Sequence, residues 1–162
     1  MQDNNNPKIL DCFHNALKKN FLSFCGTEPV FTKITEQNET SDIVVGTISL
    51  LGEEATWSLM LGLPRETVTP LVLKFAGFEI DFESPDMGDF VGEMANIIAG
   101  DLVANLCNIG IDTNMSLPTV ARCKGIQILK VSNFVYEQFI YTIPFGKFWV
   151  CIISGSKNTQ KK

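Results

Sequence analysis

The chain has 162 residues, of which 45% are hydrophobic and 19% charged. This balance is typical of one globular domain with a substantial core, and we expect residues 1–162 to form a single domain. The net charge of −5 at pH 7 argues against nucleic acid as a partner, because neutralising phosphates requires clustered Lys and Arg.

In the first half of the chain, segments with helical or alternating apolar spacing are separated by Gly, Pro and polar runs. The predicted elements are a helix over residues 7–25, a strand over 30–35, a polar loop over 36–42, a hairpin of strands over 43–51 and 55–61, and a shorter helix over 64–76. The first helix contains His14, the only histidine. We assign it no catalytic role, because a lone histidine on a helix flank is usually structural or simply exposed.

The longest predicted helix covers residues 85–109, and the rest of the chain is organised around it. Ser84 is its expected N-cap, with Pro85 at the first helical position. Apolar residues recur every three or four positions and predict a stripe that faces the core. The stripe consists of Val91, Ala95, Ile98, Leu102, Leu106 and Ile109.

The opposite side of this helix has an unusual composition for a surface in contact with water. At about 100° per residue, four residues fall within about 60° of one another. They are Asp89, Glu93, Asn96 and Gly100. A glycine inside a helix costs roughly 0.5–1 kcal/mol relative to alanine. A bare backbone at Gly100 therefore favours a partner that approaches the helix closely.

Beyond the long helix the chain is rich in β-branched and aromatic residues. The predicted segments are a polar loop over residues 112–116 and strands over 118–123, 127–131, 134–143 and 148–154, the last two forming a hairpin. Residues 1–6 and 156–162 are expected to be mobile tails. Together these elements predict an α+β fold. It has a largely antiparallel sheet with a long central helix and further helices on one face, and a pseudo-twofold helix-plus-strands repeat.

Residues that commonly bind metals or catalyse hydrolysis are sparse. The five cysteines are scattered with no CxxC pair, which indicates reduced, mostly buried thiols. One histidine without paired ligands makes a metal site supplied by this chain improbable. The phosphate-binding and nucleophile motifs GxxxxGK[ST], GxGxxG and GxSxG are absent. With neither a signal peptide nor a long apolar run, we expect a cytoplasmic protein without membrane insertion.

The long helix and the segment after it resemble the CheC/CheX/FliY family of chemotaxis phosphatases. The family pattern is Asp or Ser, three residues, Glu, two residues, Asn, and a Pro about twenty residues later. Here it corresponds to Asp89, Glu93, Asn96 and, within SLPTV, Pro118. The sequence GEMANIIAGDL is also close to the family's version of this helix. The first helix has no Glu-x-x-Asn, so the resemblance is closer to CheX, with one such helix, than to CheC, with two.

The resemblance implies a phosphatase that acts on the phosphoaspartate of a CheY-like response-regulator receiver domain. Asn96 would orient the attacking water, and Glu93 would dock a receiver lysine. Contacts with the partner are expected at Asp89, Ile97, Gly100 and Ala104. The protein would need no cofactor of its own, since Mg²⁺ would belong to the receiver. The resemblance also implies a homodimer.

Two other interpretations stay open at this point. One is a non-catalytic module of the same fold that binds a receiver or a flagellar-switch protein. The other is a small α+β ligand-binding or assembly domain whose resemblance is accidental, in which case another element should cover the outer face of the long helix. Uncharged Asn96 beside acidic Glu93 favours the phosphatase.

Overall fold

The computed structural model describes residues 6–156. The helices are α1 (Pro7–Cys25), α2 (Arg65–Ala76) and α3 (Pro85–Asn108). The strands are β1 (Val30–Ile34), β2 (Asn38–Gly52), β3 (Ala55–Pro64), β4 (Thr113–Met115), β5 (Thr119–Gln127), β6 (Val135–Ile143) and β7 (Gly146–Ser156). The two long helices and both hairpins therefore form where the sequence predicts them.

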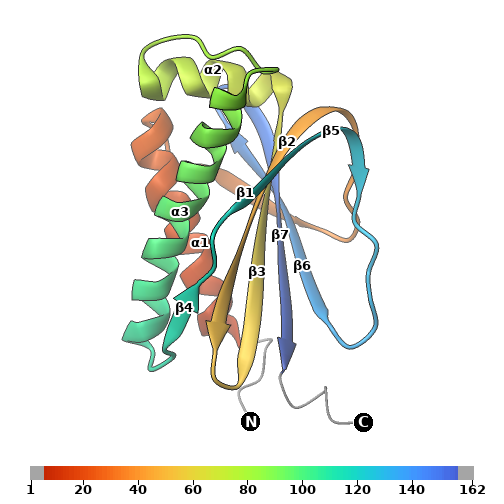
Figure 1. Ribbon diagram of the computed structural model, residues 1–162. Coiled ribbons are helices and arrows are strands. Elements are labelled where there is room, and N and C mark those ends of the chain that lie inside the picture. Colours follow the sequence, from red (N-terminus) through yellow and green to blue (C-terminus); the bar gives the residue numbers. More distant parts are fainter. Residues whose placement is uncertain (1–5, 157–162) are drawn as a thin grey trace.

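The strands form one seven-stranded sheet in the order β1-β6-β7-β3-β2-β4, with β5 also pairing with β2. Every pairing is antiparallel. Helices α1 and α3 lie side by side on one face of the sheet, and α2 lies across one end of them (Figure 1). The predicted α+β architecture, with helices on one face of an antiparallel sheet, is confirmed.

The predicted internal repeat is visible in the order of the strands. Apart from the short helix α2 and the three-residue strand β4, each half of the chain is a helix followed by three strands, α1 with β1 to β3 and α3 with β5 to β7. Exchanging β1 with β5, β2 with β6 and β3 with β7 converts the order β1-β6-β7-β3-β2-β5 into its own reverse. The sheet thus has a pseudo-twofold axis between β3 and β7.

Three predictions about strands and loops are wrong. The polar segment 36–42 is largely strand, because β2 already starts at Asn38 and pairs with β5 around an irregularity between Glu39 and Asp42. The strand predicted over 127–131 does not form, since β5 runs without a break through Gly125 to Gln127. Gly125 adopts a φ of +73° and lies against the Glu39 carbonyl, so it adapts β5 to the irregularity in β2. The predicted loop 112–116 contains the short strand β4.

Two residues of the predicted tails, Asn6 and Ser156, belong to ordered elements. The Asn6 side chain accepts a hydrogen bond from the Lys8 backbone N–H at 3.0 Å and caps α1. At the other end, Ser156 pairs with Ala55 as the last residue of β7. The remainder of the predicted tails, 1–5 and 157–162, lies outside the described residues.

The apolar composition of α3 bears on the prediction that the protein does not insert into a membrane. Among the described residues it is the one helix whose length and composition would allow it to cross a membrane. Its apolar side packs on the sheet and on α1.

Polar contacts join α1 to α3 at the edge of this core. The Asp101 carboxylate accepts hydrogen bonds from Lys19 Nζ and Asn20 Nδ2, both at 2.7 Å. The hydrogen bond from Lys19 lowers the pKa of Asp101, so its carboxylate stays charged at neutral pH. One turn further along α3, Asn105 Nδ2 donates to the Cys12 carbonyl at 3.2 Å. These contacts fix how far α3 can slide or rotate against α1.

Candidate functional site

Close packing against β2 determines which side of α3 faces the core. A Cβ on Gly46 of β2 would lie 3.1 Å from Val91 Cγ1 and 3.7 Å from Ala95 Cβ, so the absence of a side chain lets the helix approach the sheet. The predicted stripe is buried except at its end. Ile109 is 39% exposed because α3 stops at Asn108, and Ile111 is buried after the turn instead.

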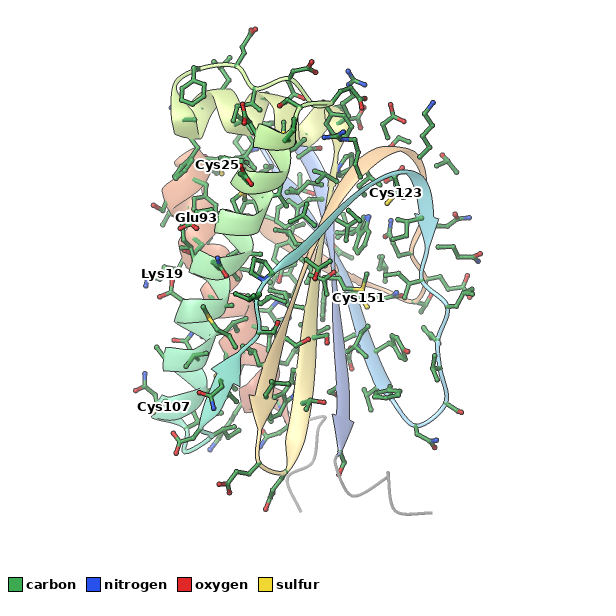
Figure 2. All side chains as sticks on the ribbon, viewed as in Figure 1. Lys19, Cys25, Glu93, Cys107, Cys123 and Cys151 are labelled. Carbon is green, nitrogen blue, oxygen red and sulfur yellow. The ribbon has the colours of Figure 1, made fainter. Side chains whose placement is uncertain are left out.

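All six predicted site residues lie on the outer side of α3. Ile97 is 37% exposed and Asn96 is half-buried. The other four, Asp89, Glu93, Gly100 and Ala104, are exposed. Figure 2 shows Glu93 projecting from α3 on the side away from the sheet. No other element of the described chain covers this face, so the accidental-resemblance interpretation is not supported.

Glu93 and Asn96 are free to engage another molecule. Neither side chain makes a hydrogen bond or ion pair with any residue that the structure describes. Residues three apart on a helix have neighbouring Cβ atoms, about 5–6 Å apart. A carboxylate and a neutral amide with both donor and acceptor groups therefore stand together, held by a helix whose other sides are packed.

Pro118, the distant part of the sequence pattern, is close to this pair in space. A Cβ on Gly92 would lie 3.9 Å from Pro118 Cγ and 3.5 Å from Val120 Cγ2. Gly92 directly precedes Glu93, so the start of β5 flanks the α3 turn that carries the pair. The residues of the sequence pattern, from Asp89 to Pro118, thus lie close together on one surface of the fold.

Gly100 lies on the same face two turns after Glu93. A Cβ there would meet no atom within 4 Å. Packing within the chain therefore does not require glycine at this position, and its cost to the helix has no internal explanation among the described residues.

Helix α3 starts at Pro85, as predicted, but it lacks a capping hydrogen bond from a side chain. Ser84 occupies the N-cap position, but its side chain does not cap the helix. Its Oγ instead donates to the Asp81 carbonyl at 2.8 Å, while its own carbonyl accepts from Arg122 Nη2 at 2.8 Å. The turn before α3 is therefore tied to β5 through Arg122.

Helix α1 offers no second open pair. It has Asp11 and His14 at the spacing of Glu93 and Asn96, and Asp11 is exposed, but His14 is buried. The His14 ring stacks on Phe31 of β1 at 3.9 Å and hydrogen-bonds the Tyr141 hydroxyl through Nδ1. Burial lowers the pKa of His14 to about 4 and raises that of Tyr141. Both groups are therefore neutral at pH 7, and His14 is structural, as predicted.

Metal-binding chemistry has little support among residues 6–156, which contain no group of three or more His, Cys, Asp and Glu side chains able to hold an ion. All five cysteines are free thiols. Cys12, Cys25 and Cys151 are buried, Cys123 is half-buried and Cys107 is exposed.

Sequence reasoning missed the apolar surroundings of the pair. Leu117, directly before Pro118, is 89% exposed. Phe75 at the end of α2 is 45% exposed and contacts Phe90 of α3 with ring centroids 5.8 Å apart. The SLPTV segment offered a signal for Leu117, but the contact between Phe75 and Phe90 depends on how α2 folds back.

The antiparallel sheet with helices on one face is the fold of CheC-like proteins. A CheC-like superfamily protein from Shewanella sp. PV-4 superposes with a TM-score of 0.80 at 19% identity, covering 92% of this chain and 98% of that one. Chemotaxis protein CheX from Desulfovibrio desulfuricans gives a TM-score of 0.76 at 21% identity, covering 90% and 97%. The CheX–CheY–BeF3–Mg²⁺ complex from Borrelia burgdorferi gives a TM-score of 0.64 at 20% identity, covering 91% of this chain and 97% of that one.

The family model "Chemotaxis phosphatase CheX" matches residues 44–142, which is more than half of the chain. The chain belongs to the CheX family. A search of curated protein sequences finds no match.

The environment of His14 gives a pH-dependent prediction. A histidine whose pKa falls from 6.5 to about 4 on folding contributes stability above pH 6.5, and that contribution is lost as the pH falls toward 4. Nearby Asp11 and Glu137 raise the His14 pKa and Lys18 lowers it, but desolvation dominates. We therefore expect the free energy of unfolding to fall more steeply between pH 6.5 and 4 in the parent than in His14→Phe. Urea titrations across this range measure the difference. Parallel curves would contradict the assignment.

Proposed function

We propose that this protein hydrolyses the phosphoaspartate of a CheY-like receiver domain, with Asn96 orienting the attacking water and Glu93 pairing with a receiver lysine. The observation that carries the proposal is the open, unpartnered Glu93 and Asn96 on one turn of a well-packed helix. Membership of the CheX family supports the reaction class. The Borrelia relative in complex with CheY, BeF3 and Mg²⁺ supports the partner.

The chemistry of an acyl phosphate suits a neutral amide at the reacting centre. The water oxygen bonds to phosphorus as the bond to the aspartyl oxygen breaks, releasing a carboxylate and inorganic phosphate that takes up the water's proton. Positioning and electrostatics provide most of the catalysis in such transfers. The Asn96 carbonyl can accept from the water while its NH₂ donates to a phosphoryl oxygen, without the repulsion of a second anion.

Glu93 has a different role in this proposal. A carboxylate that faced the phosphoryl group would be repelled by its negative charge. A lysine beside the phosphorylation site would instead attract the Glu93 carboxylate. Exposed Asp89, one turn earlier, extends the acidic edge. Glu93 therefore sets the register of the two proteins, and Mg²⁺ is carried by the receiver.

Gly100 and Ala104 complete the contact surface. Because no atom of residues 6–156 would lie within 4 Å of a Cβ on Gly100, a receiver can lie directly against the helix backbone there. Ile97 on the flank adds apolar contact. A homodimer and a cytoplasmic location, both expected from the sequence, are compatible with this arrangement and remain predictions.

The first test concerns Asn96. Asn96→Ala should slow dephosphorylation by about 100-fold, equivalent to about 3 kcal/mol of barrier. The attacking water is then no longer oriented by the amide, while docking of the receiver is retained. The measurement is the loss of label from a phosphorylated receiver of the same genome. Asn108→Ala, an exposed asparagine at the end of the same helix, is the matched control and should keep the parent rate. An Asn96→Ala protein as fast as the parent would rule out this site, and binding without turnover by the parent would favour the non-catalytic alternative.

The second test separates docking from chemistry. Glu93→Gln should raise KM for the phosphorylated receiver by about ten-fold and leave kcat nearly unchanged, because it removes one charged contact made in both ground and transition states. The parent's KM should rise with salt more steeply than that of the variant. Glu54→Gln in the exposed turn between β2 and β3 changes the net charge equally and should behave like the parent. A fall in kcat at constant KM would assign Glu93 to the chemical step instead.

The third test uses Gly100. Gly100→Gln should increase the stability of α3 by about 0.5 kcal/mol, since glutamine is the better helix former. It should also raise KM, because its side chain occupies the space reserved for the receiver. Thermal unfolding and steady-state kinetics on the same preparation give the two readouts. A more stable protein with the parent KM would show that the receiver does not lie against this turn.

A further inference from the structure

Exposed apolar side chains stand on both sides of the open polar pair. We define the apolar frame as Phe75, Phe90 and Ile97 on the side toward α1 and α2, and Leu117 on the side of β5. Leu117 is 89% exposed, Phe75 45% and Ile97 37%, while Phe90 is half-buried. Large apolar side chains exposed singly are common, but several surrounding one polar site indicate an interaction surface.

The frame follows from helical geometry on one side. Phe90 lies three residues before Glu93 and Ile97 lies four residues after it, so both are its neighbours on the same flank of α3. Phe90 is continued outward by Phe75, whose ring also contacts Phe24 of α1 at 5.1 Å. The aromatic side of the frame is therefore anchored to all three helices and is held in place before a partner arrives.

The other side of the frame is a single residue held by a proline. Pro118 lies against Gly92, and Leu117 precedes it on the chain. The neighbouring Ser116 is fixed to β2, where its backbone N–H donates to the Ser49 carbonyl at 2.9 Å and its Oγ accepts from the Ser49 N–H at 3.0 Å. Leu117 is thus carried by an anchored backbone although its side chain is almost fully in water.

We infer that the apolar frame is the docking surface that selects the receiver domain, an inference that rests on the proposed function. The occupant is a folded receiver that presents its phosphoaspartate and a lysine to the centre of the frame and apolar side chains to its rim. The frame residues adjoin Glu93 along α3 and Pro118 across it, so the frame is continuous with the surface proposed to meet the phosphoryl group. The acidic centre further requires a partner with positive charge at the middle of its contact surface.

This arrangement divides the work between two kinds of residue. The frame excludes water and sets affinity through side chains that do not reach the phosphoryl group, while Asn96 acts on the water. Substitutions in the apolar frame should therefore change KM and the affinity for an activated receiver, whereas substitution of Asn96 should change kcat. The same division predicts that receivers with polar residues opposite Leu117 or Phe75 are poor substrates.

The test compares Leu117→Ser, Ile97→Ser and Phe75→Ser with the parent protein. Each should raise KM for the phosphorylated receiver, and Kd for the same receiver loaded with BeF3 and Mg²⁺, by about ten-fold with kcat unchanged. Leu117→Ser is the decisive variant, because so exposed a side chain contributes little to folding. The matched control is Leu129→Ser, which changes a leucine that is 74% exposed. This leucine belongs to the segment that joins β5 to β6, and that segment lies away from α3 (Figure 1).

The outcomes separate this inference from the proposed function. A parent protein that turns over the receiver, with Leu117→Ser and Ile97→Ser keeping the parent KM and Kd, overturns the frame and leaves the phosphatase intact. A parent that binds the BeF3-loaded receiver without turnover overturns the catalytic proposal, while the Kd values still test the frame. If no receiver of the genome binds the parent, both are wrong. Equal weakening by Leu129→Ser would also overturn the frame, since it would show a general apolar effect.

Discussion

The orientation of α3 on its axis is the constraint on which the surface of this protein depends. One side of the helix is held by Gly46 of β2, where Val91 and Ala95 fill the space of a missing side chain. Asp101 joins the helix to α1 on one flank, and Pro118 and Val120 lie against Gly92 on the other. A rotation by one residue, about 100°, would bury a carboxylate and expose the stripe. Because burying an unpaired charge is very unfavourable, this orientation of the helix keeps Glu93 in the water and half-buried Asn96 beside it at the surface.

The rigidity of that surface matters for the chemistry. An unpartnered polar side chain costs nothing while it is solvated, but it gains catalytic value only if its backbone is already in the right place. Asn96 is carried by a helix with three packed sides, so little ordering remains to be done when a partner binds.

The sequence predicted the parts of the fold and site that follow from local periodicity. The 3.6-residue spacing of Val91, Ala95 and Ile98 was enough to place Glu93 on the opposite, exposed side of α3. Features that depend on distant neighbours were not predictable. The path of β5 depends on Gly125 meeting the Glu39 carbonyl, and the turn before α3 uses Ser84 as a partner of Asp81 and Arg122 instead of as a cap. In the same way, the contact between Phe75 and Phe90 depends on how α2 folds back onto α3.

The pseudo-twofold arrangement allows the polar pairs of the two long helices to be compared. Both helices lie on equivalent halves of one sheet, and both carry an acid with a polar residue three positions later. In α1 the second residue is His14, which is enclosed by Phe31, Phe139 and Tyr141 and kept neutral by burial. In α3 it is Asn96, beside which the chain has glycine at Gly92 and a proline that packs against it. Aromatic side chains of β1 and β6 close over His14, whereas no element of the described chain lies over Glu93 and Asn96, and Phe75 and Phe90 stand to one side of that pair. Two helices on equivalent halves of one sheet thus differ in accessibility because of the side chains that neighbouring strands place against them.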